Sequence, residues 1–112
     1  MKVAIVGSRN FADRCAVELF VSRLSPDDEV VSGGARGVDT WAVEYAKSLG
    51  LRTVIFPANW NANGLSAGFI RNKLIINAAD RVVAFWDGKS KGTAHSIELA
   101  KRANKPLTVH IA

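Results

Sequence analysis

The sequence has few of the features that hold small proteins together without a hydrophobic core. Its 112 residues include one cysteine, Cys15, which excludes an internal disulfide. No hydrophobic run approaches the roughly 20 residues of a membrane-spanning helix, and the short apolar segment after Met1 is too brief for a secretory signal. We therefore expect one cytoplasmic domain, residues 1–112, with no membrane partner.

Acidic residues are scarce in the second half of the chain. Overall, 15 lysines and arginines stand against 10 aspartates and glutamates, giving a formal net charge of +5. Opposite charges cancel over residues 1–56, so the whole excess lies in residues 57–112. A solvated basic face and an attraction for a phosphate-bearing partner both explain this excess.

Short hydrophobic segments alternate along the chain with segments of helical periodicity. Four are continuous and rich in β-branched and aromatic residues, which indicates strands buried on both faces of a parallel sheet: residues 3–6, 30–31, 54–56 and 82–86. A fifth, residues 107–111, alternates and predicts an edge strand. Helical stripes fall at residues 17–24, 38–49, 70–78 and 94–103, the last two opening near Ser66 and Thr93. The order predicts an α/β fold, a doubly wound parallel five-stranded sheet in a single domain.

The glycine-rich segment Ser32–Asp39 lies directly between a predicted strand and a predicted helix. Three glycines in five positions permit a tight turn that brings backbone N–H groups close to an anion, and the helix dipole adds to the attraction. An ordinary glycine-rich turn with a solvent-facing arginine is the alternative. Asp39 either accepts hydrogen bonds from ribose hydroxyls or stabilises the helix dipole. The predicted phosphate-binding residues here are Gly33, Gly34, Ala35, Arg36 and Gly37.

Glycines, hydroxyl side chains and basic residues also follow the other predicted strands. Ligands of doubly wound sheets bind outside the carboxyl ends of the strands, so these loops are expected to form one site. Backbone nitrogens around Gly34 and Gly92 are expected to face a common hollow, with Trp60 either stacking on a base or packing at the rim. The further predicted binding residues are Gly7, Ser8, Arg9, Trp60, Arg71, Asn72, Gly92 and Thr93.

Spacings typical of metal sites and of common catalytic motifs are missing. The histidines, Cys15 and the acidic residues show no metal-ligand spacing, so we expect no metal and no cofactor. Ser8 does not lie in the GxSxG motif of a nucleophilic serine. Residues 88–93 do not follow the GxxxxGK(S/T) order of a Walker ATP-binding loop. His95 lies in a predicted first helical turn. Its imidazole is either a neutral group near the ligand or an ordinary surface side chain.

Together these motifs resemble the YspA-related branch of the SLOG superfamily over nearly the whole chain. The segments that carry the resemblance are Ser32–Asp39, Trp60, Ala67–Asn72, and Gly92-Thr93 followed by Ile97 and Ala100. The sequence has Asn59 and Ile75 where the branch often has aspartate and methionine. The resemblance implies a Rossmann-like fold that binds a small nucleotide-derived ligand, such as an ADP-ribose relative or a nucleoside monophosphate, as a sensor.

Two related families keep other functions open. Cytokinin-activating phosphoribohydrolases, with motifs similar to Arg71 and Gly92-Thr93, cleave nucleoside monophosphates by means of a glutamate that His95 replaces here. That resemblance leaves Arg71, His95 and Asp87 as catalytic candidates. The DNA-processing protein A family has a turn resembling residues 32–39 and uses its Rossmann domain on single-stranded DNA. A small ligand is favoured over nucleic acid, because no basic cluster with interleaved aromatic residues is present; whether the chain forms a homodimer stays open.

Overall fold

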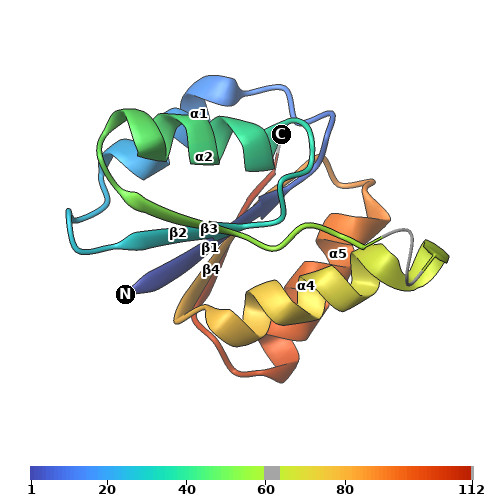
Figure 1. Ribbon diagram of the computed structural model, residues 1–112. Helices are drawn as coiled ribbons and strands as arrows, with labels where there is room; N and C mark the ends of the chain where they lie inside the picture. Colours follow the sequence, from blue (N-terminus) through green and yellow to red (C-terminus); the bar gives the residue numbers. More distant parts are fainter. Residues whose placement is uncertain (60–63, 112) are drawn as a thin grey trace.

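The computed structural model describes residues 1–59 and 64–111, which form a sheet between two layers of helices (Figure 1). The strands are β1 (Lys2–Gly7), β2 (Glu29–Ser32), β3 (Arg52–Ile55), β4 (Arg81–Trp86) and β5 (Leu107–Ile111). The helices are α1 (Arg14–Ser22), α2 (Val38–Ser48), the short 3₁₀ helix η1 (Gly64–Ser66), α4 (Ala67–Ala78) and α5 (Lys91–Arg102). In these two ranges, none of the helices has the length and apolar character required to cross a membrane.

The five strands of this described part are all parallel and lie in the order β3-β2-β1-β4-β5. Val3 pairs with Val30 of β2, and Ala4 pairs with Val82 of β4. The predicted doubly wound parallel sheet is confirmed, with β5 at one edge as its alternating sequence indicates. The chain builds outward from β1 to β3, then returns to add β4 on the other side of β1. The strand order therefore reverses between β1 and β4.

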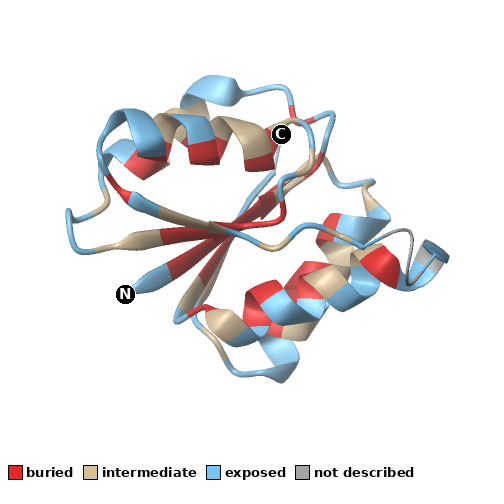
Figure 2. Ribbon diagram, viewed as in Figure 1, coloured by how far each residue is buried: buried red, intermediate tan, exposed pale blue. Residues whose placement is uncertain are grey.

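Alternate residues of the central strands face opposite helix layers, as the two-residue period of a strand requires. Val3 and Ile5 of β1 pack with α1 and α2, whereas Ala4 and Val6 pack with α4 and α5. Figure 2 shows buried residues along the strands and on the sheet-facing sides of the helices. Covering both faces explains why the strand segments are continuously hydrophobic.

The helix ends follow their capping residues. α4 begins directly after Ser66, as predicted. α5 begins at Lys91, earlier than predicted, because the side chain of Ser90 accepts a hydrogen bond from the Thr93 amide and serves as the N-cap. The structure therefore places Gly92 and Thr93 inside the first turn of α5. η1 was not predicted.

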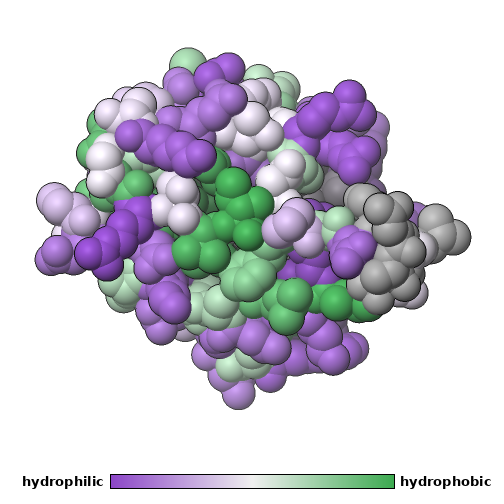
Figure 3. Space-filling model, in the orientation of Figure 1, coloured by the Kyte–Doolittle hydropathy of each residue, from purple (hydrophilic) through white to green (hydrophobic). Residues whose placement is uncertain are grey.

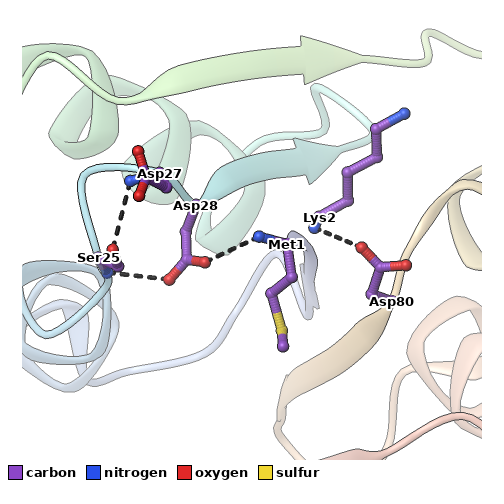
Figure 4. Close-up of polar contacts among 6 residues, drawn as sticks. All are labelled: Met1, Lys2, Ser25, Asp27, Asp28 and Asp80. Atoms are coloured by element: carbon purple, nitrogen blue, oxygen red, sulfur yellow. Dashed lines mark hydrogen bonds and ion pairs between the residues drawn. The ribbon is translucent and has the colours of Figure 1, made fainter.

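Backbone contacts to carboxylates fasten the amino-terminal edge of the sheet (Figure 4). The Met1 nitrogen donates to Asp28 Oδ1 at 3.1 Å, and the Lys2 amide donates to Asp80 Oδ2 at 2.7 Å. The Ser25 amide donates to Asp28 Oδ2 at 2.9 Å, and this hydrogen bond holds the pKa of Asp28 below its ordinary value. These hydrogen bonds at the amino-terminal ends of the strands join β1 to the segments beside it. A ligand site is therefore expected at the carboxyl ends of the strands.

Candidate functional site

A cavity of about 540 Å³, called the first cavity here, opens at the carboxyl ends of β1 and β4, where the strand order reverses. Doubly wound sheets bind ligands at such a point, and the volume is typical of small-molecule sites. The end of β1 with the loop that follows it, the start of α2, the first half of α4, the β4–α5 loop and the start of α5 form its walls. Its lining residues are Val6, Gly7, Arg9, Asn10, Ala35, Asp39, Gly68, Phe69, Arg71, Asn72, Ile75, Asp87, Lys89, Ser90, Gly92, Thr93 and Ser96.

Three basic side chains line the first cavity beside the carboxylates of Asp39 and Asp87. Arg9 and Lys89 are exposed side chains on two different loops, and Arg71 reaches the cavity from α4. The first-turn amides of Lys91 and Gly92 have no intrahelical acceptor, because an α-helix leaves its first N–H groups unpaired. Arginine, lysine and helix N-terminal amides are the groups that bind phosphate.

Asp39 lies at the floor of the first cavity and is only 5% exposed. Its Oδ2 atom accepts a hydrogen bond from the Ala35 amide at 3.2 Å. Its Oδ1 atom is buried and has no hydrogen-bond partner in the described part of the chain. The carboxylate thus occupies the amide-lined turn that the sequence assigns to a phosphate, and one of its oxygens is buried there without a hydrogen-bond partner among the described residues.

Burial raises the pKa of Asp39 from an ordinary 3.8 to about 6. The backbone groups of Ala35, Gly33 and Gly7 and the positive charge of Arg71 act in the opposite direction. Loss of water around the carboxylate outweighs these contacts. Folding therefore maintains a costly buried carboxylate, which is more typical of a functional group than of a structural one.

Arg71 ties α4 to the glycine-rich loop. Its Nη1 donates to the Gly33 carbonyl oxygen at 2.9 Å, and its Nε donates to Asn72 Oδ1 at 3.1 Å. Gly33 is needed for this contact, because a Cβ at that position would lie 2.6 Å from Arg71 Nη1. Both residues were predicted as ligand-binding, and the structure brings them together.

Asn72 extends the same chain of contacts to α5. Its Nδ2 donates to the Gly92 carbonyl oxygen and lies 3.3 Å from His95 Nδ1. Since an amide nitrogen only donates, Nδ1 of His95 accepts and its ring proton lies on Nε2. Burial lowers the pKa of His95, which also packs edge-on against Phe69. His95 does not line the first cavity, so it supports Asn72 from behind.

Ser8 and Thr93 join β1 to α5 beneath the first cavity. Ser8 is 1% exposed, its Oγ lies 3.3 Å from Thr93 Oγ1, and the same Oγ accepts from the Asp87 amide at 3.2 Å. Asp87 Oδ1 accepts from the amides of Lys89 and Ser90, both at 2.8 Å, and these bonds lower the pKa of Asp87. Ser8 therefore organises the site from outside the cavity, and Asp87 holds the β4–α5 loop in shape as an ionised group.

Two further predicted glycines permit close packing, Gly7 between β1 and α2 and Gly37 between two loops. A Cβ at Gly7 would lie 2.5 Å from the Val38 Cβ. Gly37 has a φ of +83°, and a Cβ there would lie 2.8 Å from the Arg9 carbonyl oxygen. Side chains other than hydrogen are therefore excluded at both positions. These glycines bring β1, α2 and the following loops into contact.

A second cavity of about 490 Å³ adjoins the first and shares Arg9, Ala35 and Arg71 with it. Gly34 lines this second cavity, whereas Gly92 lines the first. The expected common hollow is thus two neighbouring hollows, because the Arg71 side chain reaches across to Gly33 between them. The remaining lining residues of the second cavity are Gly33, Arg36, Ile55, Pro57 and Ala58.

Several cavity residues were not predicted from the sequence. Asn10 and Lys89 lie beside predicted loop residues, and Ser96 lies one helical turn beyond Thr93, so helical spacing was an available signal. Gly68 and Phe69 reach the cavity only through the placement of α4. Trp60 lies outside the described residues. Within residues 1–59 and 64–111, no group of three or more histidine, cysteine, aspartate or glutamate side chains could hold a metal ion.

A doubly wound parallel sheet with a polar cavity at its point of reversal defines a Rossmann-like domain. The model of the YspA, cpYpsA-related SLOG family matches residues 1–62, and the chain belongs to this family. It is 34% identical to the Gene 61 protein of Mycobacterium phage D29, over 95% of this chain and 93% of that protein.

Two solved structures of DNA processing protein A share the fold. The one from Helicobacter pylori, described for its single-stranded DNA binding mode, has a TM-score of 0.82 and 26% identity over 97% of this chain. The one from Streptococcus pneumoniae has a TM-score of 0.85 and 23% identity over 96% of this chain. The chain spans 64% and 49% of these two structures respectively.

Proposed function

We propose that this protein binds a phosphate-bearing nucleotide or nucleotide-sugar, an ADP-ribose relative or a nucleoside monophosphate, in the first cavity. Family membership and the DNA processing protein A neighbours support nucleotide or nucleic-acid binding. The observation that carries the narrower proposal is the buried Asp39, whose Oδ1 has no hydrogen-bond partner among the described residues, in the lining of a cavity that Arg9, Lys89 and Arg71 also line. A ligand with hydroxyl donors at one end and a phosphate at the other satisfies both groups.

The sugar is assigned to Asp39 because a buried acceptor without a partner costs about 1–3 kcal/mol. A ribose diol that reaches the Asp39 carboxylate would supply the missing donor and remove this cost. The phosphate is assigned to Arg9, Lys89 and the α5 amides at the mouth, rather than to the turn that the Asp39 carboxylate already occupies. This arrangement separates the two negative charges.

Calorimetric titration with AMP, adenosine and 2′,3′-dideoxy-AMP tests both assignments. AMP is expected to bind at least about tenfold more tightly than either analogue, which corresponds to about 1.4 kcal/mol. Arg9→Ala and Lys89→Ala are each expected to weaken AMP binding by roughly tenfold through loss of a phosphate contact. Arg52→Ala, which removes an exposed charge from the amino-terminal end of β3, is the matched control. Equal binding of AMP and both analogues would overturn the proposal.

Single-stranded DNA binding is a second candidate, favoured by the likeness to the Helicobacter pylori structure and by the net charge of +5. A strand that contacts several sites along the surface gains affinity as it lengthens, whereas a ligand confined to a cavity does not. Oligonucleotide length therefore separates the two candidates.

A further inference from the structure

The second cavity differs from the first in chemistry. Ile55, at the end of the edge strand β3, is 42% exposed and forms part of its wall together with Pro57 and Ala58. Figure 3 shows apolar surface on the face where β3 and α4 lie. The exposed side chain of Arg36 lines the same cavity. Flat rings bind between such partners, because an arginine plane stacks on a ring and an aliphatic wall excludes water from its other face.

Arg71 lies where the two cavities meet. A guanidinium carries five N–H donors. Two of Arg71's are used by Gly33 and Asn72, and no further acceptor is seen for the rest in the part of the chain that the structure describes. Because the side chain lines both cavities, its remaining donors are accessible from the shared boundary, where Arg9 lies as well. Two arginine side chains that can bind an anion therefore stand between the two cavities.

We infer that the two cavities are halves of one site, and that the ligand has two ring-bearing units joined by a phosphate bridge. The bridge lies on Arg9, which both cavities share, with Lys89 and the α5 amides on its first-cavity side and Arg71 at the boundary. A ribosyl unit enters the first cavity, and the second ring enters the second cavity against Ile55 and Arg36. Each cavity alone has a volume within the range of about 300–1,000 Å³ that small-molecule sites show. This inference rests on the proposed function and assigns the ligand class for the same site.

Two sources supply this chemistry: a pyrophosphate-linked dinucleotide-like molecule and a short phosphodiester-linked strand. ADP-ribose and the dinucleotide pApA represent them, and AMP is the one-unit reference. The wild-type protein is expected to bind at least one of the two-unit ligands about tenfold or more tightly than AMP. Whichever of the two binds more tightly identifies the linkage.

Variants of the second cavity test the inference separately from the proposed function. Ile55→Trp fills the second cavity from an exposed position, and Arg36→Ala removes the stacking cation. Each variant is expected to bind the two-unit ligand less than about threefold more tightly than AMP. The affinity of each variant for AMP itself is expected to equal that of the wild-type protein. Leu49→Trp adds the same side chain at an exposed position at the end of α2 and is the control.

Two results overturn the inference. One is equal affinity of the wild-type protein for AMP and both two-unit ligands. The other is an advantage of the two-unit ligand that survives both Ile55→Trp and Arg36→Ala. In either case AMP binding that still depends on Arg9 leaves the proposed function standing, whereas loss of all AMP binding would remove both.

Discussion

Asp39 has an ordinary position in the sequence and an unusual one in the structure. A first-turn aspartate normally sits in solvent and stabilises the helix dipole. Here the turn Gly33–Gly37 wraps around the carboxylate, so that Ala35 donates to one oxygen while the other is buried without a hydrogen-bond partner among the described residues. The sequence identifies Asp39 as a ribose-binding candidate, but its burial depends on the path of the whole loop and on Arg71 packing against Gly33. Residue type and spacing alone do not contain that information.

The raised pKa of Asp39 predicts that Asp39→Asn stabilises the protein at neutral pH. A carboxyl whose folded pKa of about 6 exceeds its ordinary 3.8 stabilises the fold fully below pH 3.8 and loses that contribution as the pH rises through 6. The difference corresponds to roughly 3 kcal/mol at pH 7. Urea unfolding at pH 7.5 should therefore show a gain of up to about this size for the variant, and unfolding at pH 4 should show almost none.

Asp27→Asn is the control for this experiment, since Asp27 is an exposed carboxylate at the opposite edge of the sheet. A loss of stability in Asp39→Asn at pH 7.5 would contradict the prediction, because it would mean that the amide contacts outweigh burial. The same variant is expected to reduce the preference for AMP over its dideoxy analogue, since an amide presents a different set of donors and acceptors.

At the level of the elements, the strands and helices follow from hydrophobic patterning, and the loops only in part. The continuous strands and the alternating β5 are predicted correctly because both faces of a parallel sheet are covered. The start of α5 is predicted too late because Ser90 and Thr93 are both acceptable N-cap residues, and only the Ser90 side chain meets the amide. The sequence predicts Gly7, Gly33 and Gly37 to be ligand-binding residues. In the structure each lets another segment pack closely against it, namely Val38 of α2, Arg71 of α4 and the backbone of Arg9 respectively.

Gly92 and Gly7 are expected to respond oppositely to alanine. A Cβ at Gly92 meets nothing within 4 Å and lies inside α5, so Gly92→Ala should raise stability by roughly 0.5–1 kcal/mol. A Cβ at Gly7 collides with buried Val38, so Gly7→Ala should lower stability by about 1–3 kcal/mol. Thermal and urea unfolding of the two variants measure the difference.

Gly92→Ala also separates stability from binding. The added methyl group enters the lining of the first cavity, so AMP should bind more weakly to a protein that unfolds less readily. Binding of AMP that is as tight as in the wild-type protein would show that the ligand does not approach the first turn of α5.

At the scale of the whole molecule, the amino-terminal and carboxyl-terminal ends of the strands have different roles. The amino-terminal edge is fastened through Asp28 and Asp80, while the loops of the carboxyl edge form the two cavities. The sequence predicts the correct edge, because glycine and charged residues gather after the strands. It does not predict the division into two cavities, because that depends on the direction of a single side chain from α4.

Confinement of the ligand to a cavity predicts a shallow response of affinity to salt despite the net charge of +5. If one or two phosphates are neutralised, the slope of log K against log salt should be about −1 to −2, and affinity for oligo-dT should not rise between short and long strands. Titrations of pTpT and longer oligo-dT at several salt concentrations measure both quantities. Lys101→Gln, which removes a charge from the last turn of α5 outside both cavities, should leave the slope unchanged. A steep slope with rising affinity would favour the single-stranded DNA candidate.

The hydrogen bonds that Arg71 makes to Gly33 and Asn72 have a consequence for how a ligand is received. A free arginine side chain carries about 2 kcal/mol of rotamer entropy, which a binding partner must overcome to immobilise it. In this protein folding has already restricted that freedom, with some of the guanidinium's donors left unused. The binding site is therefore preorganised, and diffusional encounter with the ligand rather than rearrangement of Arg71 should limit the association rate.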